Sequence, residues 1–521
     1  MLLGACAPDP QQQAVDAGKA KLDTELRHAR VDLGLPDALL KPITDQEAKI
    51  AAGNSGSGAS AKDAAANYQL LYTQLVGVEQ TANDTLKKQA QADFGALTNV
   101  LNQRRSQGFT EAAAYQARLD QALKDFDNAK TAGDYAKVDA TVRAQTSALN
   151  ALWPAYQKLQ DFKQTVAAMR AAGITTSFGE QEYEQDAQVF RDASAADRYQ
   201  KLNDVIDGQI MQLMADQTEA LPYIGQTMLS GFQARIDELK AWGEQTADFQ
   251  QQHDAAAADL AQAKSLADYL TIAQRLTTQT NAMALPLVRG KARADLALLR
   301  KLVDAEQAID PTRAYSYADP FEGIGDARDR FAAAQTADDF QNADADINVL
   351  ITNLRALHDD STDTTPPWQA HQTDLGLMRQ YQILSGKVVM VSLIEQTARF
   401  YENGVLVYWS YVTTGRQDLP TPPGLHYAME RDAHIEFRSS APKGSPDWYA
   451  PTPINYAVLF ANYGFFLHDA WWRYQFGPGS NLPHWDPLAF NGGSHGCVNF
   501  PEDNMLWVYN WTDVGTPVVV Y

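Results

Sequence analysis

The spacing of the apolar residues changes once along this chain. From about residue 60 to residue 358 they recur every three or four positions, whereas beyond residue 385 they alternate with polar residues. The first spacing is that of one face of an α-helix and the second is that of a β-strand. Because helices come first and strands afterwards, the sequence predicts separate domains, an all-α helical repeat or bundle followed by a mainly-β domain.

Four segments of the first region share a helix-start pattern: TAGDY, SAADRY, SLADY and TADDF. Each has a hydroxyl residue followed three positions later by an aspartate, which predicts a capping box. These pairs are Thr131/Asp134, Ser194/Asp197, Ser265/Asp268 and Thr336/Asp339. The aromatic residues of the units, with a weaker copy near the start, are Tyr68, Tyr135, Tyr199, Tyr269 and Phe340.

After each of the four later aromatics, apolar or small residues recur at +3, +7, +11 and +14. Steps of this size place them on one helix face, so we expect four or five helical units that bury each other's stripe. We expect the aromatics to be core anchors. The acidic pair Asp344 and Asp346 is expected on a solvated helix face, not in a metal site.

Two breaks in composition divide the chain. A Gly/Ser run covers residues 53–58, and an Asp/Thr/Pro run covers residues 359–367. We therefore expect an N-terminal tether and flexible linker over residues 1–62, helical repeats over 63–358, a linker over 359–384 and a second domain over 385–521. Within that domain, strands are predicted for residues 387–393 and 515–521. A hairpin is predicted for residues 397–411, because Asn403-Gly404 separates two β-rich runs.

The charge of the chain limits its partners. The formal net charge is −21 at pH 7, and no basic stripe is present to neutralise phosphates. We therefore expect no nucleic-acid partner. No apolar run approaches the roughly 18–20 residues that span a bilayer.

One of the two cysteines, Cys497, lies in the stretch Gly-Gly-Ser-His-Gly-Cys. A cysteine attacks an amide as thiolate and needs a base, for which His468 and His495 are both available. The N–H groups of Gly496 and Cys497 would stabilise an oxyanion. Pro501 is expected to open a helix whose dipole favours the thiolate. Two alternatives are a buried, inert Cys497 and a zinc site made by Cys497 with three histidines; these are His468, His484 and His495.

The motif Ser494-His495-Gly496-Cys497-Val498-Asn499, with Phe466-Leu467-His468 upstream, resembles the active site of the YkuD-type L,D-transpeptidases of bacterial cell walls. Gln396, the hairpin around Asn403-Gly404 and Thr413-Thr414-Gly415 also match the order of that fold, and the resemblance covers about residues 385–521. It implies that Cys497 is the nucleophile and His468 the general base, with His495 and Ser494 shaping the loop. It implies no metal and no cofactor.

The function that this resemblance implies is cross-linking of peptidoglycan. Cys497 would form a thioester with a tetrapeptide stem, and an amine of a neighbouring stem would resolve it into a 3→3 cross-link. Carbapenem-type β-lactams would acylate the same cysteine. Two alternatives are an L,D-carboxypeptidase that uses Cys497, and a cell-wall-binding or scaffold protein in which the helical repeats are the functional part.

The loop between His468 and Ser494 holds 25 residues, which is longer than is usual in the family. Its aromatic residues include Trp472 and Trp485, whose flat faces would cover a sugar or a stem peptide; packing within the loop is the alternative. Asn499 stands where some relatives carry arginine. We therefore expect Arg473 to supply the cation that binds a substrate carboxylate.

The first residues also contain a processing motif. Leu3-Gly4-Ala5-Cys6 resembles a bacterial lipobox, which predicts lipidation of Cys6 and an extracytoplasmic protein held at the cell envelope by a lipid anchor. The segment before Cys6 is shorter than a full signal peptide, which a truncated start would explain. The alternative is a disulfide between Cys6 and Cys497.

Overall fold

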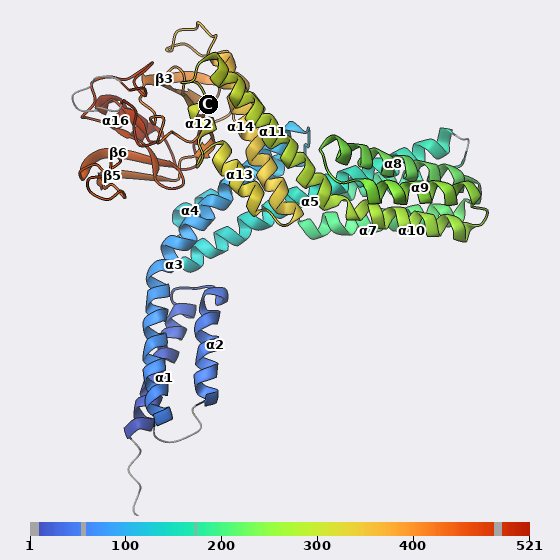
Figure 1. Ribbon diagram of the computed structural model, residues 1–521, viewed down its shortest axis with the longest axis horizontal. Coiled ribbons are helices and arrows are strands. Elements are labelled where there is room, and N and C mark those ends of the chain that lie inside the picture. Colours follow the sequence, from blue (N-terminus) through green and yellow to red (C-terminus); the bar gives the residue numbers. More distant parts are fainter. Residues whose placement is uncertain (1–9, 54–58, 172–173, 484–491) are drawn as a thin grey trace, which may run out of the picture. The chain divides into compact units, whose positions relative to one another are not determined.

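A computed structural model describes residues 10–53, 59–171, 174–483 and 492–521 (Figure 1). The chain divides into two compact units. One comprises Met1–Phe94 with Gln121–Arg143, and the other comprises Gly95–Asp120 with Ala144–Tyr521. Among the described residues, no helix combines the length and the apolar character that crossing a membrane requires.

The helices follow the chain in this order: α1 (Pro10–Val31), α2 (Asp37–Gly53), α3 (Ala59–Ser106), α4 (Ala113–Asn128), α5 (Ala132–Ala171), α6 (Ser177–Asp192), α7 (Ala196–Asp216), the 3₁₀ helix η1 (Thr218–Ala220), α8 (Leu221–Ala241), α9 (Ala247–Gln262), α10 (Leu266–Ala282), α11 (Ala284–Ile309), α12 (Tyr315–Ala318), α13 (Ile324–Ala333), α14 (Ala337–Asp360), α15 (Gln372–Gln380) and α16 (Glu502–Trp511). The region before the strands is thus helical, as its apolar period predicts.

The strands are β1 (Lys387–Ser392), β2 (Thr397–Glu402), β3 (Val405–Tyr411), β4 (Gly424–Tyr427), β5 (Glu430–Phe437), β6 (Thr452–Ala461), β7 (Phe465–Asp469), β8 (Val498–Phe500) and β9 (Pro517–Val520). They form a five-stranded sheet of order β3-β2-β1-β9-β4 and a four-stranded sheet of order β5-β6-β7-β8. The predicted fold class, a helical region followed by a mainly-β domain, is confirmed.

The first unit contains helices where the sequence analysis expects a tether. Helices α1 and α2 occupy most of residues 10–53, and their residues Leu22, Leu26 and Leu40 are buried. The segment differs from the expectation because these leucines recur at helical spacing in an otherwise polar stretch, whose composition alone indicates a linker. The turn between the helices lies against the start of α5, where Gly133 donates a backbone hydrogen bond to Leu33 at 3.1 Å.

Three of the four predicted capping boxes form. Ser265 with Asp268 caps α10, Thr336 with Asp339 caps α14, and Thr131 exchanges the same pair of hydrogen bonds with Asp134 before α5. The exception is the pair Ser194/Asp197. There α7 begins one residue later, with Ala195 at its N-cap and no side-chain cap. This segment has one residue more between its aspartate and its aromatic anchor than the others, so burying Tyr199 shifts the helix start.

The stripes predicted on α5, α7, α10 and α14 are buried, including all four aromatic anchors. Among their members only Thr280 of α10 is not buried. The expectation for Asp344 and Asp346 is wrong, since both side chains are buried on α14. They form ion pairs with Lys291 and Arg330, each at 2.8 Å, which compensates the cost of removing the carboxylates from water.

The two faces of the five-stranded sheet are buried by different elements. On β1, Val389 and Val391 point into the core shared with the four-stranded sheet and α16, whereas Val388 and Met390 pack against α14 and α15. This alternation is the period of two that predicts the strand. The turn of the predicted hairpin has positive φ at Asn403 (52°) and Gly404 (76°), as a type I′ turn requires.

Residues 359–384 do not form an extended linker. They include the end of α14 and the whole of α15, and Leu377, Met378 and Tyr381 pack on the outer face of the sheet. The linker is predicted from the Asp/Thr/Pro run, which forms a surface turn between two packed helices. That run does not predict how the apolar residues after it pack.

Candidate active site

The motif cysteine lies where two parallel strands meet. Strands β7 and β8 pair His468 with Asn499 and Leu467 with Val498, so Cys497 is placed immediately before β8. Its Sγ atom accepts a hydrogen bond from the N–H of Phe466 at 3.4 Å and lies 3.7 Å from the carbonyl oxygen of Gly464. The strand pairing therefore fixes the thiol beside the strand that carries His468.

A cavity of about 420 Å³ opens beside this thiol. Its walls bring together all but one of the predicted site residues that the structure describes: Arg473, Trp472, His468, Ser494, His495, Cys497 and Asn499. The exception is Gly496, which does not line the cavity. Two predicted residues, Trp485 and the lipidation site Cys6, lie outside the described residues. So does His484 of the alternative zinc set. The volume is in the range of small-molecule sites, so a peptide has room beside the sulfur.

Both partners of the proposed chemistry are uncharged in this arrangement. Burial raises the pKa of the Cys497 thiol to about 11, although the N–H of Phe466 acts in the opposite direction. Burial also lowers the pKa of His468 to about 4. The expected stabilisation of a thiolate by a helix dipole is absent, because β8 separates Cys497 from α16, which begins at Glu502. A thiol and a neutral imidazole are present at neutral pH.

The tautomer of His468 follows from its surroundings. Its Nδ1 atom lies 2.8 Å from the carbonyl oxygen of Asp469, which can only accept, so Nδ1 carries the proton and Nε2 is the basic atom. The ring is enclosed by Phe437 and Trp472. By contrast, His495 is exposed on the loop and packs edge-on against Tyr449. Within the described part of the chain, neither imidazole is hydrogen-bonded to the sulfur.

Ser494 holds the loop that presents the cysteine. Its Oγ atom donates to the carbonyl oxygen of Cys497 at 2.5 Å and accepts from the N–H of Gly496 at 3.0 Å. The prediction that Gly496 offers a free N–H for an oxyanion therefore differs from the structure, because the neighbouring hydroxyl already accepts that hydrogen. The N–H of Cys497 has no acceptor among the described residues.

Several residues of the cavity are missing from the sequence analysis. They are Arg416, Phe437, Pro446, Trp448, Tyr449, Thr452 and Ile454. Trp471 and Gly493 also line the cavity, and both lie in segments that the sequence singles out, the long loop and the stretch before Cys497. The missing residues precede the motif by more than 30 residues, so the spacing around Cys497 gives no signal for them. Arg416 is the exception, since it directly follows the matching segment Thr413-Thr414-Gly415. It forms an ion pair with Asp447 at 2.6 Å across the cavity wall.

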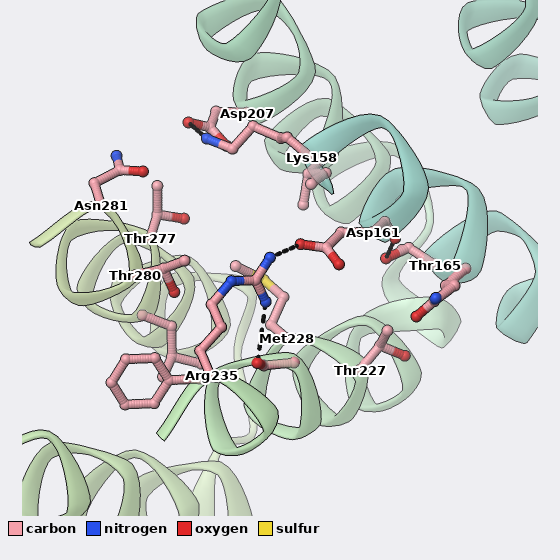
Figure 2. Close-up of a pocket in the computed structure, with 15 residues that line it drawn as sticks. Lys158, Asp161, Thr165, Asp207, Thr227, Met228, Arg235, Thr277, Thr280 and Asn281 are labelled. Carbon is pink, nitrogen blue, oxygen red and sulfur yellow. Dashed lines mark hydrogen bonds and ion pairs between the residues drawn. The ribbon is translucent and has the colours of Figure 1, made fainter. Parts of the chain in front are cut away.

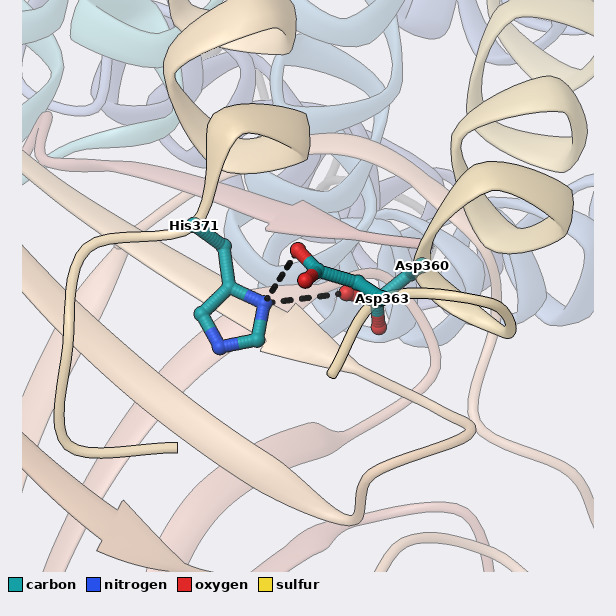
Figure 3. A group of neighbouring side chains, drawn as sticks. All are labelled: Asp360, Asp363 and His371. Carbon is teal, nitrogen blue, oxygen red and sulfur yellow. Dashed lines mark hydrogen bonds and ion pairs between the residues drawn. The ribbon is translucent and has the colours of Figure 1, made fainter. Parts of the chain in front are cut away.

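A cluster of possible metal ligands lies away from this cavity. Asp360, Asp363 and His371 bring ligand atoms together where α14 ends and α15 begins (Figure 3). The Nδ1 atom of His371 lies 3.3 Å from a carboxylate oxygen of each aspartate. Arg399 already supplies a positive charge here, with Asp360 at 3.9 Å and Asp374 at 2.5 Å. The group is a buried ion-pair network that joins the helices to β2.

The comparisons with known proteins match the second part of the chain. The family model of the L,D-transpeptidase catalytic domain, YkuD, matches residues 386–520. The chain is 31% identical over 124 residues to a probable L,D-transpeptidase 3 of Mycobacterium tuberculosis, covering 23% of this chain and 40% of the relative. It is 28% identical over 134 residues to L,D-transpeptidase 1 of the same species, covering 25% of this chain and 49% of the relative.

A solved structure of L,D-transpeptidase 3 from Mycobacterium tuberculosis, in complex with a faropenem-derived adduct, is also similar. It is 26% identical, the similarity covers 26% of this chain and 60% of that chain, and the TM-score is 0.22. The chain thus spans less than half the length of the curated relatives it matches. Residues 386–520 are therefore an L,D-transpeptidase catalytic domain of the YkuD type, preceded in this chain by a helical region.

Proposed function

We propose that this protein is a peptidoglycan L,D-transpeptidase in which Cys497 forms the acyl-enzyme on a tetrapeptide stem. The observation that carries the proposal is the position of Cys497 in the wall of an open cavity that also contains the neutral imidazole of His468. A protonated thiol beside a neutral base can act as a nucleophile, provided that its proton moves to the base as the sulfur–carbon bond forms.

The steps of the reaction balance with these two side chains. Nε2 of His468 takes the thiol proton as Sγ of Cys497 attacks the carbonyl carbon that joins the diamino acid to the terminal D-Ala. The N–H of Cys497 faces the oxyanion that develops. The carbon–nitrogen bond then breaks, and D-Ala leaves as an amine with the proton from His468. An acceptor amine attacks the thioester and returns a proton to His468, which restores the thiol.

The substrate carboxylate is assigned to Arg473. This side chain is buried in the cavity wall, and an arginine there is suited to paired hydrogen bonds with a carboxylate. Asn499 also lines the cavity and is itself uncharged. Arg473→Ala is expected to raise the half-saturating donor concentration by about tenfold or more, the cost of one charge-assisted hydrogen bond. An unchanged half-saturation would remove this assignment.

The reaction class is tested by intact mass after incubation with a carbapenem. A covalent adduct is expected on the wild type and not on Cys497→Ala. Wild-type protein without an adduct would contradict the proposed nucleophile. Incubation with tetrapeptide muropeptides then separates the activities, since cross-linked dimers form only by transpeptidation. Tripeptide monomers alone would favour an L,D-carboxypeptidase that uses the same thioester.

We also infer that the protein acts outside the cytoplasm, held to the membrane by lipidated Cys6. The inference rests on the lipobox-like residues Leu3-Gly4-Ala5-Cys6 and on the location of the proposed substrate. Metabolic labelling with a fatty acid is expected to mark the wild type and not Cys6→Ser. Equal labelling of both proteins would contradict the anchor.

A further inference from the structure

The helical part of the second unit contains a second large cavity. Its volume is about 350 Å³, close to that beside Cys497. Helices α5, α11 and α14 form much of its wall, with contributions from α3, α7, α8 and α10. The residues that carry the argument are Trp153, Gln157, Asn203, Trp242, Thr280 and Asn281. A cavity of this size in a helical bundle is large enough for a small organic ligand.

The charged side chains at one end of this cavity are paired with each other. Lys158 forms an ion pair with Asp207 at 2.6 Å, and Arg235 pairs with Asp161, as Figure 2 shows. Arg235 also donates to the carbonyl oxygen of Gly231 at 3.0 Å. A charged ligand would have to displace one of these partners, which costs the energy of a partly buried ion pair.

The cations at the other end are also engaged. Lys291 pairs with Asp344 at 2.8 Å, and the buried guanidinium of Arg104 donates to the carbonyl oxygen of Leu149 at 2.9 Å. Arg104 donates further to the side-chain oxygens of Gln107 and Gln341. The wall therefore offers no ready counter-charge to an anionic peptide, which argues against an anionic ligand.

The hydrogen-bonding capacity that remains comes from the carboxyl group of Glu238 and from neutral side chains. Among the described residues, the side chains of Gln157, Asn203 and Asn281 have no hydrogen-bond partner, and the Oδ1 atom of Asn203 is buried. A carboxamide donates and accepts at once, as the hydroxyl and acetamido groups of a sugar do. Thr280 adds a hydroxyl group to the wall. It is the member of the α10 stripe that is not buried.

Two tryptophans supply flat apolar surface beside these amides, and both are held in place. Trp153 packs edge-on against Phe109, with ring centroids 5.8 Å apart. Trp242 lies against Gly290 of α11, where an added Cβ would come within 3.1 Å of the tryptophan Cβ. Both indoles are half-buried, so they are fixed yet accessible from the cavity. Fixed rings lower the entropy cost of binding.

A smaller cavity of about 80 Å³ adjoins the large one. Both share Lys158, Asp161, Arg235, Thr280 and Asn281 in their walls, and Figure 2 shows the last two on one helix opposite the Arg235–Asp161 pair. The two cavities together therefore offer more space than a single sugar ring would fill. An extended ligand with repeated polar groups fits this shape better than a compact one.

We propose that this cavity binds a short stretch of glycan chain built of neutral, N-acetylated sugars. The identity of that glycan as the strand that carries the stem peptides rests on the proposed function. The helical region would then hold the polymer while the catalytic domain acts on its peptides.

The test uses the full chain with Cys497→Ser, so that no ligand is consumed. Oligomers of N-acetylglucosamine, and peptide-free peptidoglycan strands whose lactyl carboxylates have been amidated, are titrated by calorimetry and by tryptophan fluorescence. Saturable binding is expected, with affinity about tenfold lower in Trp242→Ala because its ring surface is lost. Trp368→Ala is the matched control, since that exposed tryptophan lies outside the cavity, and its affinity is expected to be unchanged.

Asn281→Ala serves as a second variant. Its side chain is exposed, so the substitution leaves the helix packing intact while removing one amide from the wall. Weaker binding of both glycans by this variant supports the site even where Trp242→Ala is unstable. Absence of binding by the parent protein, equal loss in Trp368→Ala, or binding of free stem peptide in place of glycan would overturn the proposal.

Failure of this site and failure of the proposed function give different results. Trp242→Ala on the Cys497 background is expected to keep its wild-type rate of carbapenem acylation, because a carbapenem carries no sugar. Glycan binding without acylation would contradict the transpeptidase alone. Acylation without glycan binding would contradict only the cavity.

Discussion

At the scale of single residues, the site depends on a thiol and an imidazole that are both neutral. Since burial places the pKa of Cys497 at about 11 and that of His468 at about 4, the reactive form of the pair predominates between these values. Protonation of His468 removes the proposed base. The acylation rate by a carbapenem is therefore expected to rise with pH through about 4 and then to stay level through neutral pH.

The ultraviolet absorbance of the thiolate provides a second measurement. The difference spectrum between wild type and Cys497→Ser is expected to show no thiolate at neutral pH and to gain it toward pH 11. Thiolate absorbance already present at pH 7 would show that an ion pair with the imidazole exists before substrate binds. Such a result would contradict the neutral pair.

Gly496 is a second residue that the structure constrains closely, because its backbone conformation and its surroundings leave no room for a side chain. Its φ is +105°, and an added Cβ would lie 2.4 Å from Cε1 of Phe465 and 3.0 Å from the carbonyl oxygen of Pro420. Gly496→Ala is expected to cost about 1–3 kcal/mol of stability and to slow acylation, because the loop must shift the adjacent sulfur. Chemical denaturation and adduct formation measure the two effects.

Gly444→Ala separates the two causes of this cost. Gly444 also has a positive φ, of +95°, but an added Cβ would have no neighbour within 4 Å. It therefore carries the backbone strain without the steric clash, and acylation is expected to be unchanged. Equal acylation rates in both variants would show that the loop around Cys497 tolerates a side chain.

At the scale of elements, the short helix α12 contacts the segment that pairs with the loop around Cys497. The hydroxyl of Tyr315 donates to the carbonyl oxygen of Gly415 at 2.5 Å and accepts from Asn481 at 2.7 Å. Gly415 in turn bridges to Ser494. Tyr315→Phe leaves a buried carbonyl without its donor, so we expect a loss of about 1–3 kcal/mol of stability and slower acylation.

Tyr317, two residues further on the same helix, is the matched control. Its ring is fully buried, and among the described residues its hydroxyl has no hydrogen-bond partner. Tyr317→Phe is therefore expected to be neutral or slightly stabilising. If both variants lose stability equally, the ring packing and not the bond to Gly415 is responsible.

Local signals in the sequence predict elements better than they predict what lies between them. Apolar residues that recur with periods of 3.6 and 2 predict the long helices and the hairpin. They do so because burying one face of an element requires apolar residues at that spacing. The helices at residues 10–53 and the packed segment that holds α15 are missed, because polar composition there hides a few leucines and aromatics. The motif around Cys497 likewise predicts the site residues that are its neighbours in sequence. Phe437 and Tyr449, by contrast, reach the cavity only because of the order of the strands.

At the scale of the whole molecule, the ion-pair network around His371 ties α14 and α15 to the sheet. Burial alone would lower the pKa of His371, but the hydrogen bond to Asp360 and the nearby carboxylates raise it overall above its ordinary 6.5. A raised pKa in the folded state means that the protonated histidine stabilises the fold. This contribution is complete below pH 6.5 and is lost as pH rises through the folded-state value.

His371→Gln isolates this contribution. The difference in melting temperature between wild type and His371→Gln is expected to be larger at pH 6 than at pH 8. Other titrating groups are common to both proteins and cancel in the difference. A difference for His371→Gln that grows toward pH 8 would contradict the charged histidine.

The position of β9 has a consequence for biosynthesis. This strand, near the end of the chain, lies between β1 and β4 and completes the face that covers Leu377, Met378 and Tyr381. The ribosome synthesises α14 and α15 long before β9. Their apolar side is therefore exposed in the nascent chain until β9 is made. That side is then a ready template on which the late strands assemble, and until they arrive it is the surface that a chaperone would have to shield.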